Sequence, residues 1–298
     1  MSHRTDNLKS FLQQRHNNED FILDTNVLRD RFFSGKGILE YLYDKSRISQ
    51  VEEDILPTSI ETFDKFIGII DTPHVYTIKE TRDETKTLQS KLADSYRFYK
   101  RHSRGSRKDR KGLRLMETLN DKIFELIKTM TSKELHPHGK LYKSVLQCVE
   151  LVSKRFDGNW REKEKAFDGH EREKPKTGFY LGTDEKIIAT ALYKSYAEEK
   201  DISIITNDER MAKKMGVAYN IISHPELFYS LTKLKERGVL VCRINSKCEI
   251  RHAKNPQIWT PREKFNFFID PKRDKDLKYE IDNILYHGQK DNDPYDKK

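Results

Sequence analysis

The spacing of apolar residues changes along the chain between the patterns of strands and of helices. Residues 21–23, Phe-Ile-Leu, form a short apolar run that predicts a buried strand. Apolar residues spaced three and four apart predict core-facing helices over 37–46 and 57–70, and a β-rich run at 74–78 leads into a long helix over 80–101. Strands that alternate with helices in this way are typical of a parallel α/β sheet.

A second region of the same kind begins near residue 179. Its pattern predicts a helix over 184–199, a strand over 202–205, a helix closed by Gly216 and a strand over 217–222, with a further helix after Ser223. The intervening segment is charged and irregular, with helical stretches at 114–130 and 140–156. We therefore expect one α/β domain over 18–234 with an insertion at 97–178, followed by a C-terminal extension over 235–298 in which 239–244 adds a strand.

Two acids stand at the ends of predicted strands. Asp24 directly follows the strand at 21–23, and Asp208 follows the strand at 202–205 after Thr206 and Asn207. The carboxyl ends of parallel strands line the ligand crevice of an open α/β sheet, so the two carboxylates are expected to converge there. The alternative for each is an ordinary N-cap of the helix that follows.

Two more acids begin the apolar faces of helices. Asp184 shares a face with Ile187, Ile188, Ala191 and Leu192, so its carboxylate is expected to point inward, whereas Glu185 lies outside the centre of that face. The alternative is that Asp184 only complements the helix dipole.

The fourth acid has to be chosen among three glutamates. Glu84 stacks with Leu88 and Leu92 on an inward face, and we select it, with Glu80 as the reserve one turn earlier. Glu61 follows Thr58 at the spacing of a capping box, which predicts a solvent-side role.

These motifs occur in an order that resembles the PIN-domain nucleases. The strand ending in Asp-Thr-Asn, the segment "HVYTIKETRDE", the helix "TDEKIIATAL" and the strand ending in Thr-Asn-Asp carry the resemblance, which covers about 18–96 and 179–234. The resemblance implies a three-layer α/β/α fold with a mostly parallel central sheet, and an endoribonuclease that leaves 5′-phosphate and 3′-hydroxyl ends. The hundred residues between Glu84 and Asp184 exceed the spacing in compact members of the family.

The resemblance also implies the roles of individual residues. Asp24, Glu84, Asp184 and Asp208 match the acids that bind Mg²⁺ or Mn²⁺, and Asn26 and Thr206 match supporting polar groups. The physical chemistry agrees, because crowded carboxylates need a cation to neutralise them and hard divalent ions prefer oxygen ligands. Such an ion can also activate water and offset charge on a phosphate, so that no nucleophilic Ser or Cys is required.

The charge of the chain points to a polyanionic partner. Lys and Arg number 57 against 48 Asp and Glu, a formal charge of +9. Much of the excess lies in 96–114, which we expect to be a flexible basic arm that holds nucleic acid, RNA rather than DNA, or else a solvated loop. The cations expected to contact phosphates are Arg97, Lys100, Arg101, Arg104, Arg107, Lys108, Arg110 and Lys111.

The remaining features favour a soluble, intracellular protein of the cytoplasm with no membrane partner. No run of 18 apolar residues and no signal-peptide pattern occurs, and three cysteines without a CxxC pair argue against a disulfide framework. A zinc site at Cys242, Cys248 and His252 is a weaker alternative, since a fourth ligand is not evident. Two other functions stay open: an RNA-binding PIN-like module that does not cut, and a phosphatase of the haloacid dehalogenase type, which needs an acid where Asn26 stands.

Overall fold

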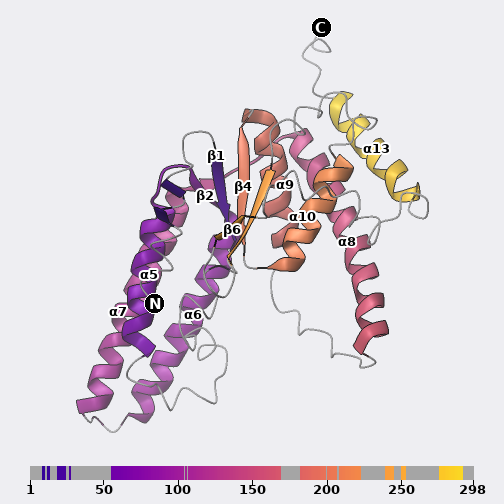
Figure 1. Cartoon of the computed structure of the whole chain (residues 1–298). Coiled ribbons are helices and arrows are strands. Elements are labelled where there is room, and N and C mark those ends of the chain that lie inside the picture. The colour runs from indigo at the N-terminus through magenta and orange to yellow at the C-terminus, as the bar shows by residue number, and fades with distance from the viewer. Residues whose placement is uncertain are drawn as a thin grey trace.

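The structure is a computed structural model that describes residues 9–10, 12–13, 19–24, 27, 55–103, 105, 107–168, 182–198, 200–206, 208–222, 239–244, 250–252 and 275–290. Its strands are β1 (Glu19–Leu23), β2 (Val75–Ile78), β3 (Glu134–Leu135), β4 (Asp201–Thr206), β5 (Val239–Ile244) and β6 (Ile250–His252). Its helices are α5 (Ile55–Ile70), α6 (Lys79–His102), α7 (Arg107–Ser132), α8 (Lys140–Asp168), α9 (Thr183–Glu198), α10 (Glu209–Ile222) and α13 (Lys275–Lys290), arranged as in Figure 1.

The strands form one six-stranded sheet in the order β3-β2-β1-β4-β5-β6. Every neighbouring pair is parallel except β5 and β6. The register of β1 and β4 places Phe21 opposite Ser203 and Leu23 opposite Ile205. The expectation of an α/β protein with a mostly parallel sheet is confirmed.

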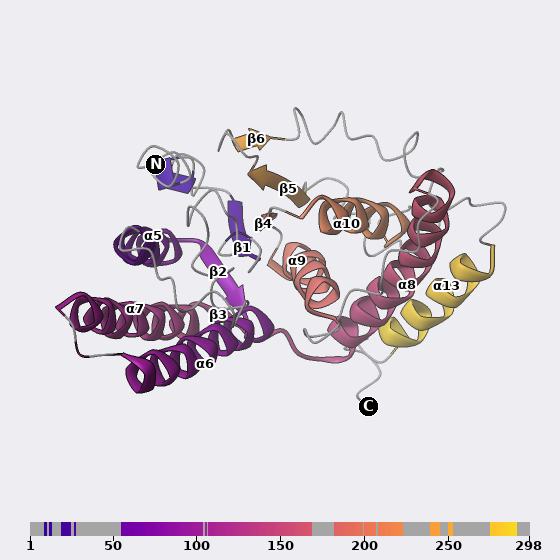
Figure 2. The ribbon, with the colours of Figure 1, turned by 90° about the horizontal axis from the view of Figure 1, so that it is seen from below.

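Helices cover both faces of the sheet and form two separate cores. Phe21 and Leu23 point to one face, where they pack with residues of α5, α6 and α7. Ile22 points to the other, where it packs with residues of α8, α9, α10 and α13. Alternate residues of a strand face opposite sides of a sheet, so the run of three apolar residues at 21–23 supplies both cores. Figure 2 shows the resulting three layers, with the sheet between the two groups of helices.

The predicted strand over 217–222 is wrong. Residues 209–222 form the single helix α10, and Gly216 lies inside it. Met211, Met215 and Ala218 are buried at helical spacing in the same core, so the apolar face continues through the glycine. The predicted helices over 37–46 and after Ser223 lie outside the described residues.

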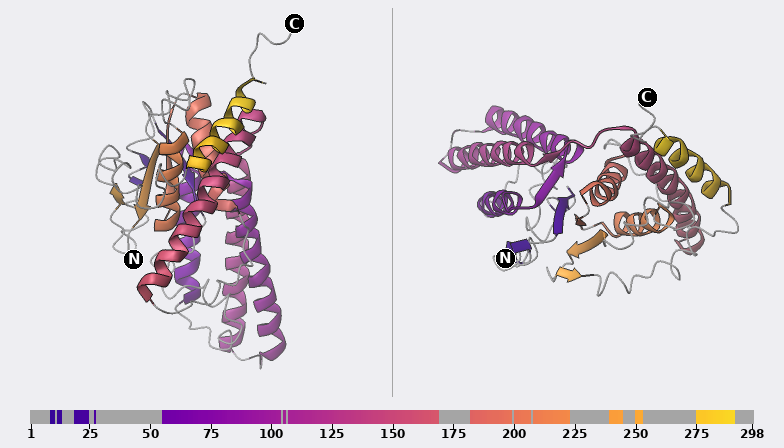
Figure 3. Two further views of the ribbon diagram at one scale, coloured as in Figure 1. Left: turned by 90° about the vertical axis from the view of Figure 1, so that its right-hand side faces the viewer. Right: turned by 90° about the horizontal axis from the view of Figure 1, so that it is seen from above.

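The described part of the charged insertion, 97–168, is largely helical and packs against the rest of the described fold. α6 and α7 form a long antiparallel pair that packs with α5, and α8 packs against α9, α10 and α13. The flexible basic arm expected at 96–114 is therefore corrected, because 96–102 and 107–114 are parts of α6 and α7. Figure 3 shows these helices continuing well past the sheet.

The C-terminal segment adds to both the sheet and the helical layer. The predicted strand at 239–244 is confirmed as β5, and Leu277 and Ile281 of α13 are buried against α8. The register of β5 and β6 places Cys242 opposite His252, whereas Cys248 lies outside the described residues, so the zinc alternative stays untested. None of the described helices has the length and hydropathy needed to cross a bilayer.

Candidate active site

The direction of the chain across the sheet reverses between β1 and β4. From β1 the chain continues to β2 and β3 at one edge, and from β4 to β5 and β6 at the other. In open α/β sheets, ligands bind beyond the carboxyl ends of the strands at such a switch point. The pairing of Leu23 with Ile205 makes Asp24 and Thr206 neighbours at this point.

Thr206 connects the two strand-end aspartates. Its hydroxyl donates a 2.6 Å hydrogen bond to Oδ2 of Asp24 and accepts a 3.0 Å bond from the backbone N–H of Asp208. Thr206 is fully buried, and Asp24 is only 1% exposed. The predicted convergence of Asp24 and Asp208, and the supporting place of Thr206, thus have a direct structural basis, while Asn26 lies outside the described residues.

Asp208 is also the N-cap of α10. Its Oδ1 accepts hydrogen bonds from the backbone N–H groups of Arg210, at 2.8 Å, and Met211, at 3.3 Å. These are the bonds of an N-cap side chain, so the capping alternative is correct for this residue. The two interpretations are compatible, because the capping bonds fix the carboxylate beside the switch point.

Glu84 reaches the same region from α6. Oε1 of Glu84 accepts a 3.0 Å hydrogen bond from the hydroxyl of Thr183, the residue before Asp184, and both side chains are buried. The reserve, Glu80, instead forms a 2.6 Å ion pair with Lys186. Of the three glutamates considered, Glu84 is thus the one that bonds to the residue beside Asp184, and its role as the fourth acid stays a prediction.

Glu61 is a surface residue, as predicted. It lies 2.8 Å from Lys65 of the same helix and is 65% exposed. The proposed capping box with Thr58 is wrong, however, because α5 begins at Ile55 and Thr58 is already inside it.

Asp184 is the last of the four acids, and its side chain is partly open to solvent, at 29% exposure. Burial raises the pKa of Asp184 to about 7, and the charges of Asp24, Glu185 and Asp208 add to the shift, although the Lys214 ammonium opposes it. The three aspartates therefore lie close enough to repel one another.

Lys214 is a member of the site that the sequence analysis missed. Its Nζ lies 3.1 Å from Glu185, 3.3 Å from Asp157 and 3.7 Å from Asp184, and its side chain is only 6% exposed. Burial opposes the charge, but these carboxylates raise the pKa of Lys214 above its ordinary value. A signal was present in the sequence, since Lys214 stands between Met211 and Met215 on the apolar face of α10.

The contacts of Lys214 correct one prediction and add a residue. Glu185 was expected to lie outside the centre of its helix face, yet it is more buried than Asp184 because α8 and α10 cover that side of α9. Asp157 belongs to α8, inside the insertion, and its carboxylate also lies 2.8 Å from the guanidinium of Arg210. The hundred-residue spacer thus supplies an acid next to the predicted site.

The donor set suits a hard divalent cation, because Asp24, Glu84, Asp184 and Asp208 offer only carboxylate oxygens and carry excess negative charge. Among the described residues, no group of three or more Asp, Glu, His or Cys side chains is already placed to hold a metal ion. Thr206, Thr183 and the start of α10 hold three of these carboxylates in their present positions.

The predicted nucleic-acid-binding cations lie elsewhere, at the far end of the α6–α7 pair. Their described side chains are exposed, namely those of Arg97, Lys100, Arg101, Arg107, Arg110 and Lys111. The side chains of Arg104 and Lys108 lie outside the described part of the chain. Searches against protein-family models, curated proteins and solved structures found no match for the chain.

Proposed function

We propose that the chain is a metal-dependent nuclease of the PIN type, an endoribonuclease that leaves 5′-phosphate and 3′-hydroxyl ends. The observation that carries this proposal is the bonding of Thr206 to both Asp24 and Asp208 at the switch point, within reach of the charge on Asp184. The order of the strand and helix motifs resembles that of the PIN-domain nucleases, and this resemblance implies the reaction type and the preference for RNA. The cysteine content keeps the cytoplasm as the expected setting.

The residues of the site prepare the acids for a cation. Thr206 and Thr183 donate hydrogen bonds to Asp24 and Glu84, and these bonds fix the orientation of the two carboxylates. Asp208 is oriented by two backbone N–H groups. Bound Mg²⁺ or Mn²⁺ would supply activated water and offset negative charge on the phosphate. The partly exposed Asp184 carboxylate is the one we expect to meet the cation first.

Two substitutions test the proposal without removing the side chains. Asp208→Asn keeps a good N-cap, and Asp24→Asn keeps an oxygen that can accept from Thr206, so both variants are expected to fold. Each should lower Mn²⁺-dependent cleavage of RNA by about a hundredfold or more, as loss of an interaction with the reacting groups does. The matched control is Glu61→Gln, which removes an exposed acid and should leave cleavage unchanged.

The readouts are gel-resolved cleavage rates and thermal unfolding. Undiminished cleavage by either aspartate variant contradicts the assignment, and so does the same loss in Glu61→Gln. Product ends are checked by ligation, which requires a 5′-phosphate on one fragment.

A second candidate is an RNA-binding module that uses the same fold but does not cut. Lys214 favours it, because a buried ammonium between Asp157, Asp184 and Glu185 already neutralises part of the acid cluster. Wild-type protein that binds RNA yet cleaves no RNA or DNA with either Mg²⁺ or Mn²⁺ would establish this alternative.

A further inference from the structure

The far end of the α6–α7 pair is a concentrated basic surface, here called the hairpin tip and defined as residues 97–114. Its only acid is Asp109, which accepts a 3.3 Å hydrogen bond from the Tyr99 hydroxyl. Arg97 lies 3.5 Å from Asp94. The other described cations of the tip form no ion pair within the described part of the chain: Lys100, Arg101, Arg107, Arg110, Lys111 and Arg114. Surface cations that lie this close together without ion-pair partners among the described residues repel one another and attract a polyanion.

An aromatic pair lies within this basic surface. Phe98 is 46% exposed, and its ring stacks on that of His102 with the centroids 4.1 Å apart and an interplanar angle of 29°. Nζ of Lys100 lies 5.7 Å from the centre of the Tyr96 ring. Exposed aromatic rings beside cations are the features that bind unpaired bases and their phosphates together.

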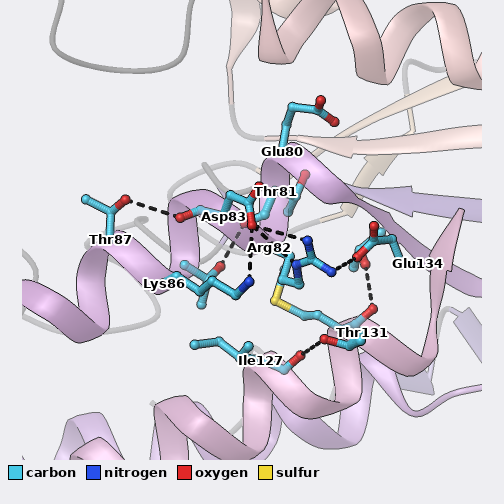
Figure 4. A network of polar contacts seen from close by, with 12 residues as sticks. Glu80, Thr81, Arg82, Asp83, Lys86, Thr87, Ile127, Thr131 and Glu134 are labelled. Atoms are coloured by element: carbon cyan, nitrogen blue, oxygen red, sulfur yellow. Dashed lines mark hydrogen bonds and ion pairs between the residues drawn. The ribbon is translucent and has the colours of Figure 1, made fainter. Parts of the chain in front are cut away.

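The tip is held on a stiff support. At the base of the hairpin, the Arg82 guanidinium forms an ion pair with the buried Glu134 of β3 and a second with Asp83, and Figure 4 shows this network where α6 meets β3 and α7. Further out, the hydroxyl of Tyr96 donates a 2.6 Å bond to Glu117 across the two helices.

Close packing between the helices adds to this stiffness. Leu88 and Leu92 of α6 belong to the same buried core as Leu119 of α7. At Gly112, an added Cβ would lie 3.3 Å from the Tyr99 hydroxyl, so the two helices touch near the tip as well. Contacts thus run from the base of the hairpin to its end.

The length of α6 fixes how far the tip lies from the acids. Glu84 and Arg101 belong to one uninterrupted helix, and 17 residues at about 1.5 Å each separate them by about 26 Å along its axis. A stacked strand rises by about 3.4 Å per nucleotide, so it needs about eight nucleotides to cover that distance, and an extended strand needs fewer.

We propose that the hairpin tip binds single-stranded RNA and that the protein therefore favours strands long enough to reach from the tip to the acids, about ten nucleotides or more. The role of the acids in this statement rests on the proposed function, whereas RNA binding by the tip does not. A strand of about four nucleotides can occupy one end only and gains nothing from the other.

The test compares two charge-matched variants. In the tip variant, Lys100, Arg101, Arg110 and Lys111 are replaced by Gln. In the control variant, four exposed lysines outside the tip are replaced by Gln: Lys128, Lys143, Lys154 and Lys275. Each variant loses four positive charges, so a difference between them reports position and not net charge. Binding is measured by fluorescence anisotropy in EDTA with a labelled RNA strand of about 24 nucleotides, and KM for cleavage with Mn²⁺ is compared between strands of about 4 and about 24 nucleotides.

The expected result is a loss that depends on length. The tip variant should bind the long strand at least about tenfold more weakly than wild type, with its log–log salt slope reduced by about 0.7 for each lost phosphate contact. With Mn²⁺, KM of the tip variant for the long strand should rise while KM for the short strand changes much less, and the control variant should stay within about twofold of wild type in both measurements. Phe98→Ala should weaken binding of the single strand more than that of a duplex of equal length.

The opposite results overturn the inference. Equal weakening by the tip and control variants, or wild-type affinity of the tip variant for the long strand, removes the tip as a binding surface. Equal effects of Phe98→Ala on single strand and duplex make it a general polyanion site. If the binding pattern holds but wild type cuts no RNA with Mn²⁺, the proposed nuclease fails and the RNA-binding tip stands. If wild type cuts but the tip variant keeps a wild-type KM for the long strand, only the tip proposal fails.

Discussion

The hydroxyl of Thr206 donates a hydrogen bond of 2.6 Å to the carboxylate of Asp24, although 182 residues separate the two in the chain. The same oxygen accepts the backbone N–H of Asp208, so one side chain uses both of its bonding capacities within the site. The strand ends and the start of α10 are thereby held in fixed positions relative to one another.

Replacing Thr206 by Val keeps the shape of the side chain and removes both bonds. Because Asp24 and Thr206 are buried, we expect the free energy of unfolding to fall by about 1–3 kcal/mol and the cleavage rate to fall with it. Thr206→Ser retains the hydroxyl and should lie close to wild type in cleavage. Urea unfolding and cleavage assays check both, and a Val variant equal to wild type would show that the bond has no role.

The raised pKa of Asp184 predicts how the stability of the protein depends on pH. Its pKa in the folded protein is about 7, above its ordinary value of 3.8, because burial and the neighbouring acids disfavour the charge. The folded state therefore binds more protons than the unfolded state between these values, and this contribution to stability is lost as pH rises from about 4 to about 7.

Asp184→Asn should remove that loss in metal-free protein. Above pH 7 the variant is expected to be more stable than wild type by on the order of 2 kcal/mol, and below about pH 4 the two should be alike. Unfolding curves in EDTA across this range make the comparison. If the stabilities of wild type and the variant change with pH in the same way, the prediction is wrong.

Lys214→Met should destabilise the protein most near neutral pH. The substitution leaves the carboxylates of Asp157, Asp184 and Glu185 without the ammonium between them, and loss of one partner of a buried ion pair costs roughly 3–5 kcal/mol. The loss should shrink at about pH 4, where carboxylates take up protons. Lys128→Met, at an exposed position of α7, is the control and should change stability by less than about 0.5 kcal/mol.

Asp20 offers a test that separates a structural acid from the acids of the site. Its side chain is 1% exposed and lies near the amino-terminal end of β1. One carboxylate oxygen is 2.9 Å from Nδ1 of His74, and the other is 3.0 Å from Nζ of Lys194. Asp20→Asn should lower the free energy of unfolding by roughly 3–5 kcal/mol, because Lys194 is itself buried. The folded variant should retain wild-type cleavage at low temperature, and a loss of cleavage without a loss of stability would argue against this division of roles.

The sequence was a good guide where one local pattern decided the outcome. The apolar run at 21–23 became a central strand, and the inward spacing of Glu84 with Leu88 and Leu92 placed its carboxylate beside Thr183. The predicted strand at 217–222 was wrong because the spacing of its apolar residues suits either a strand or a helix. The packing of Met215 and Ala218 in the core selects the helix.

Contacts between distant segments could not be predicted in this way. Asp157 meets Lys214 and Arg210 only because α8 packs across α10, and no spacing in the sequence encodes that crossing. The basic segment was assigned as a flexible arm on its composition, but burial of the opposite faces of α6 and α7 keeps it helical almost to the turn.

The pairing of β1 with β4 also has a consequence for how the protein is made. Residues 21–23 are fully buried in the finished sheet, yet their partners 203–205 are synthesised about 180 residues later. At ordinary translation rates of about 5–20 residues per second, the ribosome needs about 9–36 s to deliver them. During that interval β1 can pair with β2 but not yet with β4, so one of its edges lacks its final partner. An edge strand without its partner offers unpaired backbone groups to other chains, so this edge of β1 is open to misassociation until β4 has been made.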